Sequence, residues 1–148
     1  MGTIVVGVDG SGASIKALRY AVDEAKKTPG TEVRAVSAWH VPSGVYGSGW
    51  APSDVDLDEF RKLAQTALDE GIAAADVGGS GVTVTPVLRE GQPADVLCDE
   101  AEGSDLLVVG TRGLGGFHGL LVGSVSQQCV HHAPVPVVVI RPDKEEKH

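Results

Sequence analysis

A glycine-rich segment between residues 110 and 124 carries the clearest chemical signal in the sequence. It contains six glycines and ends at Ser124, where a helix is predicted to begin. Glycine lacks the Cβ atom that keeps backbone amides away from an anion, and it adopts the turns in which successive amides point to one place. The first amides of a helix also favour negative charge. We therefore predict a phosphate site built from main-chain amides, with a plain connecting loop as the alternative.

Asp9 is a second candidate, because it follows an apolar run and precedes a glycine. A carboxylate at this place can accept a hydrogen bond from a ribose hydroxyl, or it can hold Mg²⁺ beside a phosphate. The alternative is a helix-capping carboxylate, which is a common use of aspartate before a helix. Arg112, inside the glycine-rich segment, is either a cation over the phosphates or a solvated loop charge.

Other polar and sulfur-containing side chains carry weaker signals. His131 and His132 are neighbours in a predicted helix and therefore point in different directions, which disfavours a metal site. Cys98 and Cys129 are expected to pack as small hydrophobic residues. His118 has no obvious carboxylate or nucleophile as a partner. We interpret all of these residues as structural or incidental.

The sequence lacks the residues that fast phosphoryl transfer usually requires. It has no Gly-x4-Gly-Lys-[Ser/Thr] segment, and no Gly-x-Gly-x-x-Gly follows the first predicted strand. Lys16, the lysine nearest a glycine-rich turn, lies on the first predicted helix. The third and fifth predicted strands end in Arg89-Glu90 and Arg141-Pro142, not in the acid and the lysine of a response regulator. We predict binding with at most slow hydrolysis and assign no catalytic residue.

Periodicity and turn residues predict strands that alternate with helices. A long surface loop is expected at His40–Val55, where Tyr46 and Trp50 either cover a ligand or pack on the surface. The predicted strands are Thr3–Val8, Val33–Trp39, Val82–Arg89, Leu106–Val109 and Val135–Ile140. The first two predicted helices contain Ile15–Ala25 and Leu57–Ile72, the third begins at Pro93, and the fourth is Ser124–His132.

The strand order follows from the positions of proline and of the buried runs. Alternating strands and helices give right-handed crossovers and a parallel sheet covered on both faces. Proline is tolerated mainly on edge strands, and only the third strand (Pro86) and the fifth strand (Pro136) contain it. We predict a single-domain, doubly wound α/β fold with a five-stranded parallel sheet in the order 3-2-1-4-5. Ligands bind where such an order reverses, so the segments after Val8 and Val109 should face one crevice.

Composition limits the classes of protein to consider. The 148 residues suit one domain, placed at 1–142, with a charged mobile tail at 143–148. The net charge of −8 disfavours nucleic acid, whose phosphates are bound mainly by clustered Lys and Arg. No apolar run reaches the about 20 residues of a membrane span, and residues 1–10 show no signal-peptide pattern. With two cysteines only, we expect a cytoplasmic protein without disulfides.

The complete spaced pattern resembles that of a known family. Gly110, Gly113 and Gly123-Ser124 form the spacing Gly-x2-Gly-x9-Gly-Ser, which resembles the nucleotide-binding signature of the universal stress protein family, ATP-binding branch. The resemblance implies a fold similar to the Rossmann-like adenine nucleotide alpha hydrolases, ATP between the first and fourth strand ends, and a regulatory role in stress response or survival. The likeness extends through Val6–Ser11, Gly91–Ala94, Asp105–Gly116 and Gly123–Ile140.

The resemblance also implies roles for individual residues. The signature glycines and Ser124 match phosphate and ribose contacts, and Ser126 matches a further phosphate-contacting hydroxyl. Asp9 matches the acidic residue after the first strand, with Mg²⁺ as a ligand to consider, and the backbone of Ala38 matches the adenine contact. The nucleotide-binding residues implied in this way are Gly7, Val8, Asp9, Ser11, Ala38, Gly110, Thr111, Arg112, Gly113, Gly115, Gly116, Gly123, Ser124, Val125 and Ser126.

Three hypotheses for the function remain open at this stage. The first is a nucleotide-dependent regulator that binds ATP, ADP or AMP and forms a two-fold homodimer through the apolar edge strand Pro136–Ile140. The second is a nucleotide-free dimeric interaction module of the same fold. The third is a weak ATPase or phosphotransferase. Retention of the signature glycines favours the first hypothesis over the second, and the missing lysine and acid pairs disfavour the third.

Overall fold

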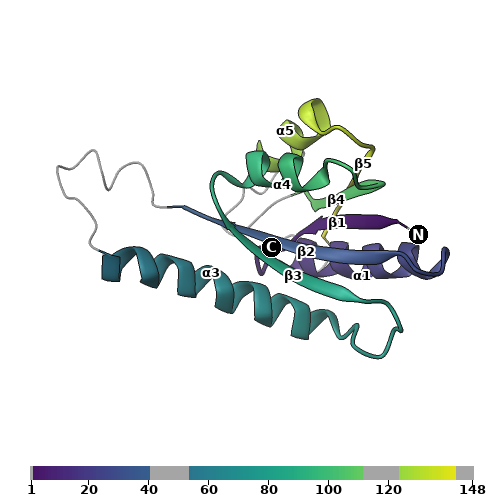
Figure 1. Ribbon diagram of the computed structural model, residues 1–148, viewed down its shortest axis with the longest axis horizontal. Helices are drawn as coiled ribbons and strands as arrows, with labels where there is room; N and C mark the ends of the chain where they lie inside the picture. Colours follow the sequence, from purple (N-terminus) through teal and green to yellow (C-terminus); the bar gives the residue numbers. More distant parts are fainter. Residues whose placement is uncertain (1, 41–53, 112–123, 143–148) are drawn as a thin grey trace.

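The chain folds into a parallel sheet with helices on both faces (Figure 1). The computed structural model describes residues 2–40, 54–111 and 124–142, with side chains from residue 57 onward in the second range. No helix in these ranges is both long and apolar enough to cross a membrane. The elements are β1 (Thr3–Gly7), α1 (Gly12–Lys26), β2 (Glu32–Trp39), α3 (Asp54–Ala75), β3 (Val84–Glu90), α4 (Pro93–Ala101), β4 (Leu106–Gly110), α5 (Ser124–His132) and β5 (Val137–Ile140).

The sheet has the predicted order, β3-β2-β1-β4-β5. Ile4 in β1 lies opposite Val33 in β2 on one side and Leu106 in β4 on the other, in parallel register. The edge strand β3 contains Pro86, as predicted. Pro136 does not lie in a strand, because β5 begins one residue after it and is two residues shorter than predicted. The inference from proline to strand order nevertheless holds, since both prolines are at the sheet edges.

Local hydrogen bonds explain where two strands begin and end differently from the prediction. β1 ends at Gly7, although the amide of Val8 still donates to the carbonyl of Val36 (2.8 Å). β3 begins at Val84 and not at Val82, because the amide of Val82 is held in the preceding turn by Ser80 Oγ (3.2 Å). A side chain that binds a nearby amide competes with the sheet for it.

Helix α3 begins inside the segment that was predicted to be a loop. His40 is an exposed residue after β2, and Asp54 and Val55 belong to α3, while the rest of that prediction, including the roles of Tyr46 and Trp50, falls outside the described residues. The carboxyl end of α3 is held by Arg19 of α1, whose guanidinium donates to the carbonyls of Ala74 (3.0 Å) and Ala75 (3.2 Å). These contacts satisfy backbone acceptors that a helix end leaves without partners.

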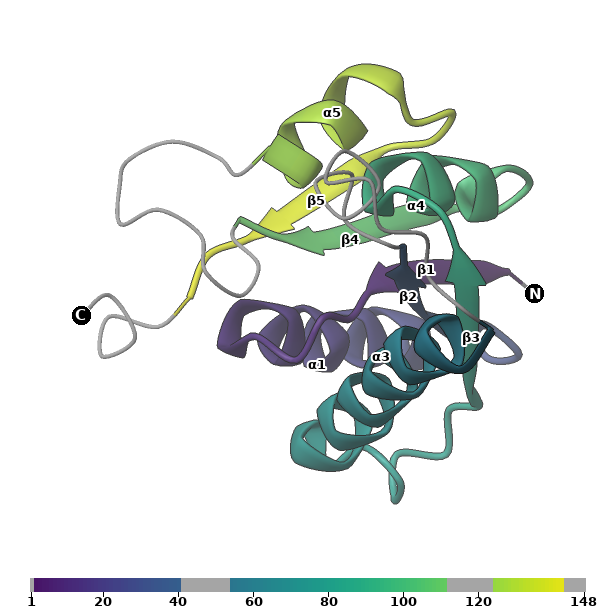
Figure 2. The same ribbon diagram turned by 90° about the vertical axis from the view of Figure 1, so that its left-hand side faces the viewer.

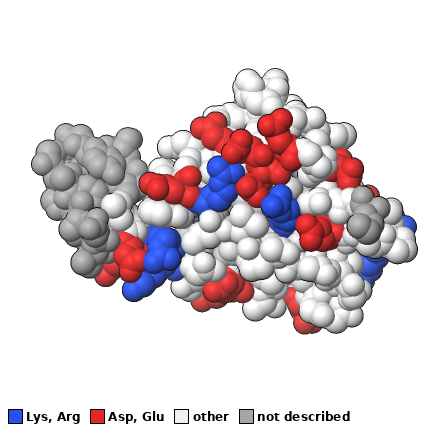
Figure 3. Space-filling model, viewed as in Figure 1, with Lys and Arg blue, Asp and Glu red and all other residues white. Residues whose placement is uncertain are grey.

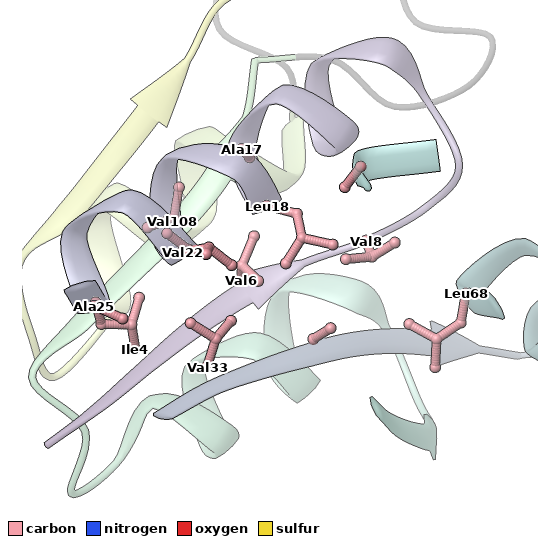
Figure 4. Close-up of a cluster of buried hydrophobic side chains, with 13 residues drawn as sticks. Ile4, Val6, Val8, Ala17, Leu18, Val22, Ala25, Val33, Leu68 and Val108 are labelled. Carbon is pink, nitrogen blue, oxygen red and sulfur yellow. The ribbon is translucent and has the colours of Figure 1, made fainter. Parts of the chain in front are cut away.

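The two faces of the sheet are covered by different pairs of helices. Helices α1 and α3 lie on one face, and α4 and α5 lie on the other (Figures 1 and 2). On the first face, Leu18 and Val22 of α1 reach down to Val6 of β1 and Val108 of β4 (Figure 4). On the second face, the apolar core is formed by valines and Leu107 of the strands with α4, Cys129 and Cys98. The cysteines therefore pack as small hydrophobic residues, as predicted.

Candidate functional site

The turn from β1 into α1 is fixed by a compact set of hydrogen bonds. Asp9 Oδ1 accepts from the amide of Ser11 (2.9 Å), and Ser11 Oγ caps the helix by accepting from the amide of Ser14 (3.2 Å). Ser14 Oγ in turn donates to the carbonyl of Ser11 (2.9 Å) and accepts from the amide of Asp9 (3.3 Å). Gly10 has a φ of +86°, a conformation that glycine adopts without strain. The turn is therefore preorganised by its own side chains.

This turn corrects one interpretation of Asp9 and adds a residue that the sequence analysis missed. The helix cap is Ser11, so Asp9 is not the capping residue. Asp9 is exposed, and within the described part of the chain its Oδ2 receives no hydrogen bond. Ser14 joins Asp9 to the helix, and the available signal was its place three residues after a serine cap.

The end of β4 lies directly against the start of α1. A Cβ atom on Gly110 would lie 2.9 Å from Ala13 Cβ and 3.3 Å from the backbone nitrogen of Ser14. Both distances are shorter than normal contacts, so glycine is required here by packing. The next residue, Thr111, is buried and donates its amide to the carbonyl of Ile140 (2.8 Å). The first residue of the glycine-rich segment is thus fixed between α1 and β5.

Helix α5 is attached to the same place through Ser126. Its hydroxyl is buried and lies 3.3 Å from the carbonyl of Thr111, to which it donates. Val125 packs against the core of the α4–α5 face, while Ser124 is exposed. The hydroxyl that the family resemblance assigns to a phosphate is therefore occupied in part by the protein's own backbone.

The remaining predicted residues divide into placed and unplaced positions. Gly7 ends β1, and Ala38 lies in β2 two residues after Val36, which receives the amide of Val8. Gly7 and Ala38 therefore lie near the carboxyl ends of two neighbouring strands. The other predicted residues lie outside the described part of the chain; these are Arg112, Gly113, Gly115, Gly116 and Gly123.

The electrostatics of the site are set by backbone more than by side chains. Helices α1 and α5 both begin at this end of the sheet, and neither has an acidic residue in its first turn. The partial positive charge at each helix start is therefore not neutralised within the helix. In the described ranges, no group of three His, Cys, Asp or Glu side chains is arranged to hold a metal ion. The arrangement suits an anion bound by amides.

Comparison with known proteins gives one consistent family. The model of the universal stress protein family matches residues 1–141. A universal stress protein of Mycobacterium tuberculosis is 38% identical over 138 residues, which cover 93% of this chain and 44% of that protein. The chain spans about half the length of the curated relatives that it matches, from 44% to 48%.

Solved structures of the same fold are also similar. The structure of a universal stress protein in complex with cAMP has a TM-score of 0.69 and 28% identity, and the likeness covers 96% of this chain and 98% of that one. A universal stress family protein from Arabidopsis thaliana with AMP bound has a TM-score of 0.65 and 22% identity, and the likeness covers 99% of this chain and 95% of that one. The second likeness supports the fold only.

Proposed function

The chain belongs to the universal stress protein family, and from this membership we propose that it binds an adenine nucleotide where the carboxyl ends of β1 and β4 meet. ATP is the proposed ligand, with ADP and AMP as the alternatives to be tested. The observation that carries the proposal is the close approach of Gly110 to the first turn of α1, which brings the glycine-rich segment to a capped helix start. A helix start favours phosphate through its first amides and its dipole, and at α1 the amides other than those of Ser11 and Ser14 would bind it.

A nucleotide at this site would use residues from three strands. The amides at the start of α1 and α5 suit the phosphates, and the exposed Asp9 suits a ribose hydroxyl. The backbone of Ala38, near the end of β2, would contact the adenine. The sheet order supports this division, because β2 and β4 flank β1 and their carboxyl ends share one edge.

Mg²⁺ would fit this site with one carboxylate ligand from the described residues, that of Asp9. Asp9 has one carboxylate oxygen that receives no hydrogen bond within the described part of the chain, and a divalent cation prefers such oxygens. One carboxylate with phosphate oxygens and water is a common Mg²⁺ environment, in which the ion neutralises phosphate charge. In this alternative to the ribose contact, Asp9 would hold the ion, and Ser11 would keep the carboxylate oriented through its amide.

The proposed role is regulation and not dedicated catalysis. The sequence offers no P-loop lysine and no acid pair for fast phosphoryl transfer, so hydrolysis would be slow at most. Binding would instead bias the surface that partner proteins contact in stress response or survival. A cytoplasmic location is part of the proposal, since both cysteines are free thiols and such thiols are typical of a reducing compartment.

The first test identifies any nucleotide that the protein carries. The purified protein is denatured, and the released small molecules are identified by mass; we expect an adenine nucleotide. Calorimetric titration of the stripped protein with ATP, ADP, AMP and cAMP, with and without Mg²⁺, then ranks the ligands. A protein that carries and binds none of them would be the nucleotide-free interaction module. Turnover above about one per second would indicate an enzyme.

Two variants test the site itself. Gly123→Val places a branched side chain where the phosphate should approach, and we expect binding to be lost. Asp9→Asn keeps an oxygen for the Ser11 amide but removes the charge, so folding should persist while Mg²⁺-dependent affinity falls. Asp23→Asn, an exposed aspartate on α1, is the matched control. Unchanged affinity in Gly123→Val would show that the glycine-rich segment does not bind the ligand.

We also propose a homodimer formed through β5. Every residue of this edge strand is partly exposed in the single chain, although all four are apolar. An exposed apolar edge strand pairs with other chains unless another segment covers it, and a second copy of this chain would cover β5. Light scattering at micromolar concentration should give twice the chain mass, and Val139→Lys should give a folded monomer. Val130→Lys, at an apolar residue of α5 that is 52% exposed, is the control and should remain a dimer.

A further inference from the structure

The only two cysteines of the chain contact one another, although 30 positions separate them in the sequence. Cys98 is on α4 and Cys129 is on α5, and the two thiols are near enough for each to influence the pKa of the other. Both belong to the apolar cluster between these helices and the sheet. Two thiols that share one cluster across a helix–helix interface can form a disulfide when their Cα atoms come within about 7 Å of one another.

The two thiols differ in access. Cys129 is completely buried, whereas Cys98 is partly exposed and lines an open groove of about 340 Å³ between α4 and α5. Three carboxylates, those of Asp95, Asp99 and Glu102, line the same groove. A small neutral molecule can therefore reach Cys98, while an anionic thiol reagent such as glutathione disulfide would be repelled.

We propose that Cys98 and Cys129 form a reversible intramolecular disulfide when the protein meets a neutral peroxide. In the first step the Cys98 thiolate attacks one peroxide oxygen and the O–O bond breaks, which gives a sulfenic acid and, with one proton, water. In the second step Cys129 attacks the Cys98 sulfur, the S–O bond breaks, and a second water leaves with the Cys129 proton. The two sulfur atoms are oxidised and hydrogen peroxide is reduced, so that two thiols and one peroxide give one disulfide and two waters.

The surroundings of the pair determine how fast it reacts. Burial raises the pKa of Cys98, the hydrogen bond from Cys129 opposes this, and Asp95 raises the pKa further. Burial, with a contribution from Cys98, raises the pKa of Cys129 to about 12. The groups that face Cys98 are the three carboxylates of the groove and His132 of α5. Because only the thiolate attacks, oxidation should be slow at neutral pH and should accelerate about tenfold per pH unit on the alkaline side.

The disulfide would act on the helix that begins at the end of the glycine-rich segment. Cys129 lies three residues after Ser126, so both buried side chains are on one face of α5. Joining Cys129 to Cys98 would fix α5 against α4. Oxidation would then stabilise the fold by a covalent link between two elements that are otherwise held by packing.

The experiment uses the full chain, reduced with dithiothreitol and then exposed to hydrogen peroxide at neutral and mildly alkaline pH. After free thiols are alkylated, intact mass and peptide mapping should show a monomer that is lighter by two hydrogen atoms and carries a Cys98–Cys129 link. Dithiothreitol should reverse the change, and the thermal unfolding midpoint of the oxidised protein should rise. Glutathione disulfide at equal concentration should react more slowly.

Single variants assign the order of attack. Cys129→Ser should stop at a sulfenic acid on Cys98 that dimedone traps, and Cys98→Ser should leave Cys129 unmodified because it is buried. The result for the wild-type protein tests the disulfide proposal even if a variant fails to fold. A peroxide-treated wild-type chain with two alkylatable thiols, with Cys98 over-oxidised beside a free Cys129, or with disulfides only between chains would overturn the proposal.

Discussion

The two faces of the sheet are built in different ways. On the α1–α3 face, the long helices α1 and α3 bury mainly apolar side chains, with Ser14 of α1 as a buried polar one, and Leu18 and Leu68 have no exposed surface. On the α4–α5 face, each helix has nine residues, and its packing includes a thiol pair and charged residues. Long amphipathic helices can bury enough apolar area to hold a sheet, whereas short ones depend more on polar contacts.

The charged residues of the second face form a connected network. Glu100 of α4 lies 2.9 Å from Arg89 of β3 and 3.6 Å from Arg34 of β2, and Arg89 also reaches Asp99 (2.9 Å). Figure 3 shows acidic side chains gathered over the α4 side of the molecule with basic ones among them. Hydrogen bonds from Arg89 to Asp99 and Glu100 raise the pKa of the guanidinium. The network ties α4 to the β2–β3 edge of the sheet.

This difference indicates a division between stability and chemistry. The α1–α3 face supplies most of the fully buried apolar side chains among the described residues, and it supports the turn that contains Asp9. The α4–α5 face contains the thiols, the groove and the ion pairs that join α4 to the sheet. We therefore expect substitutions on the first face to act on folding, and substitutions on the second to respond to salt, pH and oxidants.

The largest expected effect is on the α1–α3 face. Leu18→Ala should lower the free energy of unfolding by about 2–5 kcal/mol, because it leaves a cavity among fully buried side chains. Urea denaturation measures this value. Leu63→Ala, at a leucine of α3 that is 69% exposed, should change it by less than about 0.5 kcal/mol. Equal losses in the two variants would show that burial on this face does not determine the cost of a substitution.

A smaller effect is expected for the ion-pair network. Glu100→Ala should cost about 1–3 kcal/mol, since it removes a largely buried carboxylate and leaves two guanidinium groups without that partner. Added salt should reduce the difference between this variant and the wild type, unlike the loss in Leu18→Ala. Asp23→Ala, at a 73% exposed side chain with an i,i+3 pair, is the control and should change stability far less. A loss that does not depend on salt would point to packing alone.

The smallest expected effect is a pH dependence from Cys129. Burial raises its pKa in the folded protein to about 12, so between its unfolded pKa and that value the unfolded state binds fewer protons. Stability is therefore complete at neutral pH and decreases as the pH rises through this window. Under reducing conditions at about pH 10, the wild type should lose on the order of 1 kcal/mol more than Cys129→Ala does. Parallel pH profiles for the two proteins would contradict this assignment.

Much of the fold was predictable because its signals are local. Apolar periodicity located the helix at Ile15–Ala25, which lies within α1, and proline at the first helical position marked the start of α4. Strand ends were less predictable, since they depend on single side-chain hydrogen bonds such as that from Val82 to Ser80. The order of the strands could be inferred because prolines mark the edges of the sheet.

The site was predictable in part. The sequence indicated Gly110 as a place where a phosphate can approach, and the structure adds that α1 itself requires a glycine there. The residues assigned to nucleotide contacts remain predictions, and five of them lie outside the described part of the chain. Ser14 was missed because its place three residues after the serine cap does not show that its hydroxyl contacts two backbone groups.

The sequence by itself determined the alternation of strands and helices, the strand order and the family, because each depends on residue types at fixed spacings along the chain. Only the tertiary structure decided that Cys98 meets Cys129 and that Arg34, Arg89 and Glu100 form one network. These residues are far apart in sequence and on different elements. Their contacts depend on the position of each helix against the sheet. This position is fixed by the packing of the whole core and not by any local sequence pattern.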